Sequence, residues 1–246
     1  MLVLLTNDDG IKAEGLLTLK KELSRMADVW VVAPEGEQSA ISHSLTLHRP
    51  LEVKKISDRT YSINGTPTDA VMLGVFGILK EKPDVLISGI NHGPNLGEDV
   101  TYSGTVAGAM EGLLMGIPSI AVSVFIPRSS YFAQGAEFVK RLVSFVHNNG
   151  LPKDVLLNVN IPAKKGKMDE YEITRLGKKR KRKVELKKVN SRDRSFWWIG
   201  KENTSWFQTP GTDYSAVKRG KVSITPLHLD FTNYKVIDRI KEWRTI

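Results

Sequence analysis

The chain has 246 residues, of which 41% are hydrophobic, and it contains no cysteine. A chain of this length can build one large core that buries about three quarters of its unfolded surface. The absence of cysteine excludes disulfides, zinc–thiolate sites and thiol catalysis. No apolar run approaches the ~20 residues of a membrane span, and the apolar start is too short for a signal peptide. We therefore expect a cytoplasmic protein without a membrane partner.

The formal net charge of +9 comes from one region of the chain. Residues 164–194 hold fourteen Lys and Arg against five Asp and Glu, and the rest of the sequence is balanced. At the centre lies the basic run Lys178-Lys-Arg-Lys-Arg-Lys183. Such a run is typical of a polyanion-binding patch or of a solvated loop. The solvated loop is the favoured interpretation, because few aromatic residues interleave the run, so we expect no stable nucleic-acid complex.

The chain begins with a buried strand that ends in two acidic residues. The apolar residues 2–5 predict a parallel strand covered on both faces, and Asp8 and Asp9 follow it directly. In open α/β sheets, ligands bind at the carboxyl ends of the strands. One Asp in this place is explained by capping of the next helix. Two adjacent carboxylates exceed that need, and because their charges repel unless a cation or protons offset them, the pair predicts a metal site.

Strand and helix patterns alternate through residues 1–163 and predict a doubly wound α/β domain. We expect three α/β/α layers around a mostly parallel, Rossmann-like sheet, although the first βαβ unit lacks the G-x-G-x-x-G turn of dinucleotide-binding proteins. The predicted strands cover residues 2–5, 29–33, 85–88, 120–124 and 155–160, with a further strand or hairpin at residues 43–55. Apolar residues at helical spacing place helices at residues 16–26, 67–79, 103–114 and 138–146. Thr66, Pro67 and Asp69 predict a capped start for the second of these helices, with Thr66 as the cap.

Residues 164–246 form a second, β-rich part that is charged and aromatic, with a strand at residues 222–225 and a terminal helix carrying Val236, Ile237, Ile240 and Trp243. Two aromatic stretches, residues 196–199 and 206–207, flank Gly200-Lys-Glu-Asn203. They predict a projecting hairpin arm at residues 195–208 that turns at 200–203. Because the arm is apolar on both faces, we expect another protein surface to bury it. That surface belongs either to the arm's own domain or to a second subunit.

Three further polar segments lie after predicted strands or at the start of a predicted helix. Ser39 lies just past the second strand, and Asn91 and Asn95 lie in a glycine-rich loop after the third. Neutral oxygens of this kind bind ligands without adding charge. Ser103-Gly-Thr105 opens a helix, where free backbone N–H groups and the helix dipole attract anions. We expect Gly104 to let an anion approach the backbone, so that a side chain there blocks phosphate and leaves the metal ligands untouched.

Together these segments resemble one family, the SurE proteins (survival protein E), which are divalent-metal-dependent 5′-nucleotidases or nucleoside monophosphate phosphatases. The resemblance implies that Asp8, Asp9, Ser39 and Asn91 hold the metal and that Asn95, Ser103, Gly104 and Thr105 bind the phosphate. The matching segments are Thr6-Asn-Asp-Asp-Gly10, Ala33-Pro34, Gln38-Ser-Ala40, Gly65-Thr-Pro67, Ser88-Gly-Ile-Asn-His-Gly-Pro-Asn-Leu-Gly97, Tyr102-Ser-Gly-Thr-Val106, Thr212-Asp213 and Ser223-Ile-Thr-Pro-Leu227.

The implied chemistry is hydrolysis of nucleoside 5′-monophosphates with one divalent cation per subunit. Oxygen ligands favour Mg²⁺ or Mn²⁺ over zinc. Asp8 and Asp9 are the expected catalytic residues, and Asp8 either activates water or attacks phosphorus itself. Activity on 3′-monophosphates and polyphosphate stays open. The resemblance also implies that the arm forms a homodimer or a homotetramer.

Three other interpretations compete with the phosphatase. A signalling receiver domain is disfavoured because the third strand ends in Ser88-Gly-Ile-Asn91 without an acceptor carboxylate. A haloacid-dehalogenase-type phosphatase has Asp-x-Asp after its first strand, whereas Asp8 and Asp9 are adjacent. The third alternative is a non-catalytic protein that binds metal and uses the basic run at residues 178–183 to bind polyanions.

Overall fold

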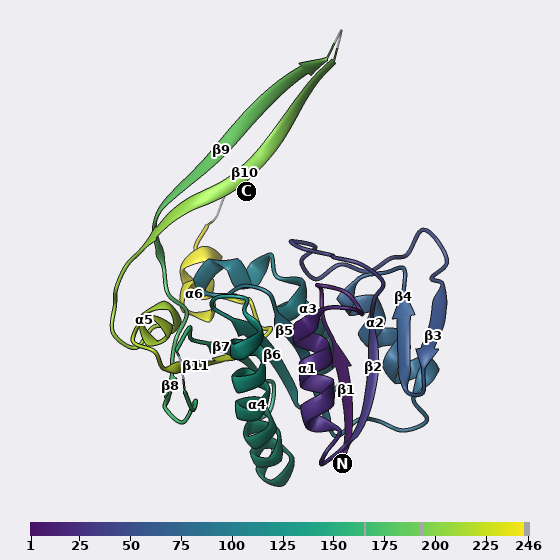
Figure 1. Cartoon of the computed structure of the whole chain (residues 1–246). Coiled ribbons are helices and arrows are strands. Elements are labelled where there is room, and N and C mark those ends of the chain that lie inside the picture. Colours follow the sequence, from purple (N-terminus) through teal and green to yellow (C-terminus); the bar gives the residue numbers. More distant parts are fainter. Residues whose placement is uncertain (165, 192–193, 244–246) are drawn as a thin grey trace.

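The structure is a computed structural model that describes residues 1–164, 166–191 and 194–243. Its centre is a nine-stranded sheet in the order β3-β4-β2-β1-β5-β6-β7-β11-β8. Helices cover both faces of this sheet (Figure 1), which confirms the predicted three-layer fold. The strands are β1 (Leu2–Thr6), β2 (Asp28–Pro34), β3 (Val53–Ser57), β4 (Thr60–Ile63), β5 (Val85–Asn91), β6 (Ser119–Val124), β7 (Leu156–Ile161), β8 (Tyr171–Ile173) and β11 (Val222–Leu227).

Successive residues of β1 pack against different layers. Val3 and Leu5 belong to one core with α1 (Glu14–Leu23) and α4 (Ser129–Asn149). Leu4 belongs to a second core with α2 (Pro67–Leu73) on the opposite face, where α3 (Gly104–Leu114) also packs. Because strand residues alternate between faces, a sheet covered on both sides needs the continuous apolar run that the sequence shows.

The start of α2 confirms the predicted capping. Thr66 accepts a hydrogen bond from the backbone N–H of Asp69, and the Asp69 carboxylate accepts one from the backbone N–H of Thr66. Pro67 occupies the first helical turn, where its missing N–H costs nothing. This cap starts α2, which continues into the π-helix η1 (Gly74–Ile78).

The central sheet continues past the predicted boundary at residue 163. Strand β11 pairs antiparallel with β7 and parallel with β8, so two strands from the second part extend the sheet of the first. The short helix α5 (Asp213–Lys218), which the sequence patterns did not predict, packs beside them. The division at 163 therefore marks a change in composition, and the sheet itself crosses it.

The predicted arm exists, but its strands differ from the prediction. It consists of β9 (Lys179–Ser191) and β10 (Arg194–Trp206), paired antiparallel as one long ribbon that projects from the body (Figure 1). The expected turn at residues 200–203 is wrong, because Gly200 lies within β10 at an irregularity of the pairing between Ile199 and Glu202. A glycine inside a strand often marks such a bulge. The pairing of β9 with β10 instead continues to Ser191 and Arg194, which lie opposite each other.

The basic run is part of a strand, which corrects the expectation of a solvated loop. Lys179 begins β9, and the following residues pair with β10. Farther along the ribbon, Lys188 lies opposite Trp197, and its ammonium is 5.5 Å from the centre of the indole ring. A two-stranded ribbon leaves both of its faces in water, so a run of basic residues fits an exposed strand as well as a loop.

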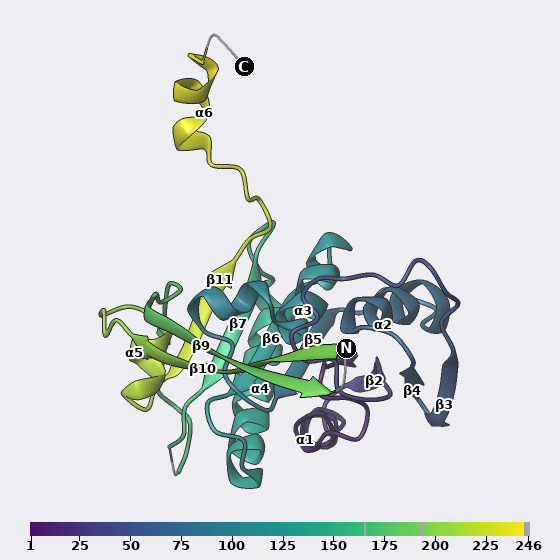
Figure 2. The same cartoon turned by 90° about the horizontal axis from the view of Figure 1, so that it is seen from above.

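The predicted terminal helix is α6 (Tyr234–Lys241), which stands away from the body at the end of the chain (Figure 2). Its residues Tyr234 and Ile240 are exposed. No helix in the described ranges combines the length and the apolar character needed to cross a membrane.

Gly15 determines how closely α1 approaches the sheet. A β-carbon at this position would lie 2.0 Å from the carbonyl oxygen of Ile90 in β5. We expect Gly15→Ala to lower the free energy of unfolding by about 1–3 kcal/mol or more, because backbone must shift to admit the methyl group. Gly77→Ala is the matched control, since its β-carbon would meet only Leu73 Cδ2 at 4.0 Å. Urea titrations measure both, and unchanged stability of Gly15→Ala would contradict this packing.

Candidate active site

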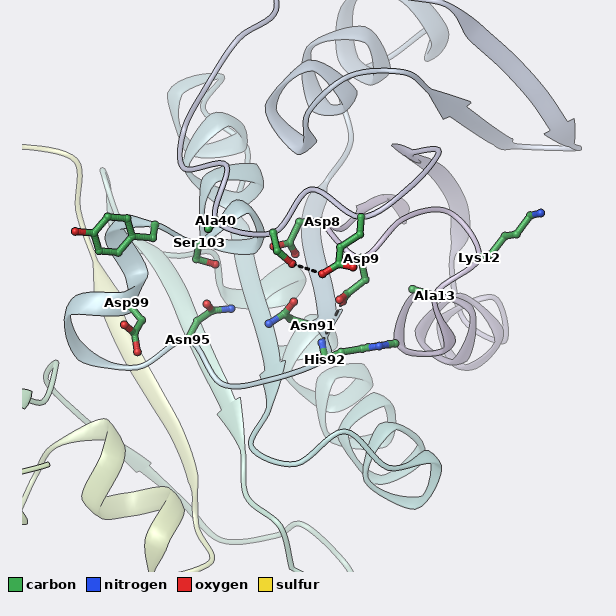
Figure 3. A pocket seen from close by; sticks show the side chains of 13 residues that line it. Asp8, Asp9, Lys12, Ala13, Ala40, Asn91, His92, Asn95, Asp99 and Ser103 are labelled. Atoms are coloured by element: carbon green, nitrogen blue, oxygen red, sulfur yellow. Dashed lines mark hydrogen bonds between the residues drawn. The ribbon is translucent and has the colours of Figure 1, made fainter. Parts of the chain in front are cut away.

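The polar segments after β1, β2 and β5 meet at one cavity of about 590 Å³ (Figure 3). This is the carboxyl edge of the sheet, where the sequence placed the ligand site. The cavity brings together six of the predicted residues, Asp8, Asp9, Ser39, Asn91, Asn95 and Ser103. Gly104 and Thr105 lie behind the wall and are buried. The remaining lining residues are Lys12, Ala13, Glu37, Ala40, His92, Asp99 and Tyr102.

Asp8 is the most deeply buried acid of the cavity, with 6% of its surface exposed. The hydroxyl of Thr105 donates to its Oδ1 at 2.5 Å. Burial raises the pKa of Asp8 to about 6; the charge of Asp9 adds to this rise, and hydrogen bonding from Thr105 opposes it. Thr105 therefore orients Asp8, whereas the sequence predicted that its hydroxyl would hold phosphate.

Asp9 is held by His92, the residue that follows β5. The backbone N–H of His92 donates to Asp9 Oδ2 at 3.1 Å. Burial raises the pKa of Asp9, and the neighbouring carboxylate of Glu37 adds to the rise, while His92 lowers it. Both acids of the pair are thus withdrawn from water, and each is fixed by a different element.

Ser39 and Asn91 offer neutral oxygens beside the two acids. The hydroxyl of Ser39 donates to Glu37 Oε1 at 2.6 Å, so its lone pairs stay available. The amide nitrogen of Asn91 donates to the carbonyl of Gly93 at 2.8 Å. This bond turns the amide oxygen of Asn91 toward Asp8 (Figure 3). All four predicted metal ligands therefore lie around one volume.

Asn95 is fixed by buried amides that the sequence analysis left without a role. Its backbone N–H donates to Asn160 Oδ1 at 2.9 Å, and its amide nitrogen donates to Ser123 Oγ at 2.8 Å. The carbonyl oxygen of Asn95 accepts from Asn158 and Asn160. Because these three partners are fully buried, they position Asn95 without touching the cavity.

The start of α3 packs directly against Asp8. Ser103 is the N-cap, and its hydroxyl accepts from the N–H of Val106 at 3.1 Å. A β-carbon on Gly104 would lie 2.8 Å from the β-carbon of Asp8. The expectation that a side chain at 104 leaves the metal ligands untouched is therefore wrong. Gly104 is required because α3 packs closely against Asp8, a residue distant in sequence.

The cavity wall is acidic, a property that no single motif revealed. Asp8, Asp9, Glu37 and Asp99 line it, and Lys12 is the only lysine or arginine among its lining residues. Of the two histidines near the motifs, His92 lines the cavity, with its ring 4.8 Å from that of Phe132. His43 lies elsewhere and contacts Glu111 at 2.7 Å.

The donor atoms fit a hard divalent cation. Two carboxylates, a hydroxyl and an amide oxygen suit Mg²⁺ or Mn²⁺. Within the described residues no group of three or more His, Asp or Glu side chains is placed to share a metal, so a cation here needs the neutral oxygens as well. Buried Asp8 and partly buried Asp9 supply the negative charge that a cation would offset.

Known proteins match nearly the whole chain. A family model described as "Survival protein SurE" matches residues 3–183. A protein named "5'-nucleotidase SurE" from Geotalea uraniireducens (strain Rf4) is 46% identical over 245 residues, which is 99% of each chain. A protein of the same name from Citrifermentans bemidjiense is 48% identical over 246 residues, again 99% of each chain.

The crystal structure of the SurE protein from Aquifex aeolicus has the same fold. It superposes with a TM-score of 0.87, is 46% identical in sequence, and the match covers 98% of both chains. The similarity thus includes the sheet, the cavity edge and the second part of the chain. On these matches, the chain is a member of the SurE (survival protein SurE) family.

Proposed function

We propose that this chain is a divalent-metal-dependent phosphatase that hydrolyses nucleoside 5′-monophosphates to nucleoside and phosphate. The names of its relatives support the reaction. The observation that carries the metal dependence is the charge of the cavity, where Asp8, Asp9 and Glu37 face one lysine, while the fourth lining carboxylate, Asp99, is paired with Lys179. A phosphate monoester is itself close to a dianion at neutral pH. The substrate therefore needs a bound cation to offset the negative charge of the cavity before it can enter.

Asp8, Asp9, Ser39 and Asn91 would hold that cation. When bound, it would supply Lewis acidity at a phosphoryl oxygen and offset charge in the transition state. The chain's own part is to hold the oxygens in place: Thr105 orients Asp8, and the N–H of His92 orients Asp9. Asp8 is the carboxylate proposed to lie nearest the reacting phosphorus.

Asn95 and Ser103 are proposed to receive the phosphate on the other side of the cavity. Both side chains line it, and both are nearly buried. Asn158 and Asn160 fix the backbone of Asn95, and Ser123 fixes its side-chain amide, so little reorganisation is needed when an anion arrives. Gly104 contributes by its lack of a side chain, which lets α3 pack against Asp8.

We also propose that the arm, β9 and β10, joins subunits into a homodimer or homotetramer. Trp197 is 60% exposed and Trp198 is 67% exposed, although both are large and apolar. Neighbouring residues alternate between the faces of a strand, so these two indoles lie on opposite faces of the ribbon. A partner subunit would cover surface that the body of the chain leaves in water.

Asp8→Asn is expected to abolish hydrolysis of nucleoside 5′-monophosphates and to weaken Mn²⁺ binding. The substitution keeps the shape of the side chain and its contact with Thr105 but removes the charge that holds the cation. Phosphate release from a panel of 5′- and 3′-monophosphates and polyphosphate, together with calorimetric Mn²⁺ titration, measures both effects. Asp238→Asn, on exposed α6, is the control. Full wild-type turnover after exhaustive EDTA treatment would refute metal dependence.

The stability of the metal-free protein should fall as the pH rises from about 4 to about 6. The pKa of Asp8 is about 6 in the folded chain and 3.8 ordinarily. In that window the unfolded carboxyl has lost its proton and the folded one retains it, so raising the pH favours unfolding. Across this window the free energy of unfolding should fall by about 3 kcal/mol.

Urea titrations in EDTA at several pH values would measure this slope. Asp8→Asn should show a shallower slope than wild type, because only the raised pKa values of Asp9 and Asp213 then contribute to it, and it should be more stable than wild type above pH 6. Asp238→Asn, which removes a carboxylate from the exposed helix α6, should keep the wild-type slope. A slope in Asp8→Asn equal to that of wild type would assign the effect to another group.

Replacing Trp197 and Trp198 with Ser should give smaller particles in light scattering, because it removes most of the arm's aromatic surface. Phe76→Ser is the matched control, since Phe76 is 73% exposed on η1 and outside the arm. If the wild type is already monomeric at micromolar concentration, the arm has no such role.

A further inference from the structure

The base of the arm packs behind one wall of the cavity. Residues 97–103 comprise the short helix η2 (Gly97–Thr101) with Tyr102 and Ser103. Asp99, Tyr102 and Ser103 of this segment line the cavity. On its other side the segment meets the arm, since a β-carbon on Gly97 would lie 2.5 Å from the carbonyl oxygen of Gly177 and 2.7 Å from the ring of Trp206.

Asp213 anchors this wall from inside the protein. Its side chain is fully buried, and its Oδ2 accepts the backbone N–H of Gly97 at 2.7 Å. Its Oδ1 accepts the N–H of Gly177 at 2.8 Å and that of Tyr214 at 2.7 Å. One carboxylate thus joins the cavity segment, the residues leading into β9 and the start of α5.

Lys179, the first residue of β9, neutralises an acid of the cavity wall. Its side chain is only 3% exposed, and its ammonium forms an ion pair with Asp99. The same ammonium lies 5.6 Å from the ring centre of Trp206, which stacks on Tyr214 with ring centres 5.0 Å apart. The lysine is therefore held in place by β10 and α5 while it faces Asp99.

We propose that Lys179 is a positioning residue of the substrate site, which holds Asp99 neutralised so that a phosphate dianion can enter. The inference rests on the proposed phosphatase function and adds to it a residue from the basic run. Asp99 is 36% exposed in its side chain and lines the same cavity as Asn95 and Ser103. Without Lys179 its full negative charge would face the incoming phosphate. The arm then has a second role besides contact between subunits.

The test is a double-mutant cycle of Lys179→Met and Asp99→Asn, assayed with a nucleoside 5′-monophosphate and Mn²⁺. Lys179→Met keeps the aliphatic stem on Trp206 and removes the charge. We expect its KM to rise about three- to tenfold at low salt, with kcat and the Kd for Mn²⁺ within about twofold of wild type. Adding Asp99→Asn should restore KM. The rise should also shrink in about 1 M salt, where screening acts over about 3 Å.

Lys188→Met is the matched control, because it removes the same charge from the same strand at a site outside the cavity lining. Its KM should stay at the wild-type value. An equal rise of KM in Lys179→Met and in the double variant would overturn the proposal, because lost packing would then explain it. An unchanged KM in Lys179→Met would overturn it as well.

Asp99→Asn alone keeps the test decisive if Lys179→Met fails to fold. The side chain is partly exposed, and removing its charge should leave KM equal to or below that of wild type. A raised KM would contradict the role of Lys179. Loss of nucleoside monophosphate hydrolysis in the wild type would instead defeat the proposed function, whereas normal wild-type turnover with equal KM in all variants would defeat this inference alone.

Discussion

The carboxylate of Asp8 is buried at the end of a central strand, and the arrangement around it depends on keeping an acid out of water. The hydroxyl of Thr105 donates to it, and α3 packs against it through a glycine. Burial raises the pKa of Asp8 to about 6, and the nearby charge of Asp9 adds to that rise. An acid pair in this state binds a cation readily, because the cation removes a cost that the fold already carries. The need for positive charge thus arises from the architecture itself.

The side of the cavity opposite Asp8 depends on the later half of the chain. Asn158 and Asn160 of β7 hold Asn95, and Asp213 of α5 holds Gly97. Strands β11 and β8 extend the same sheet. The site is therefore made by both parts of the chain, although the residues facing the proposed cation all precede residue 92. This arrangement explains why a change of composition near residue 163 has no matching break in the sheet.

Charge is separated in this molecule, with acids in the cavity and most of the positive excess around the arm. Lys179 is the point where the two meet, since it begins β9 and pairs with Asp99 at the cavity wall. Its ion pair is largely enclosed, so salt screens it less than a surface pair. The remaining exposed cations of the ribbon, such as Lys187 and Lys188, face solvent beside the exposed indoles.

Local patterns in the sequence determined the alternating strands and helices, the Thr66 cap of α2 and the place of Asp8 and Asp9 at the ligand edge. Motifs in order along the chain also pointed to the family. The tertiary structure alone decided that Thr105 serves Asp8, that Gly200 lies in a strand, and that Lys179 reaches Asp99. The reason is physical. Helix caps and strand periodicity act between near neighbours, whereas Thr105 is 97 residues from Asp8 and Lys179 is 80 residues from Asp99. The place of Gly200 likewise depends on the pairing of β10 with β9.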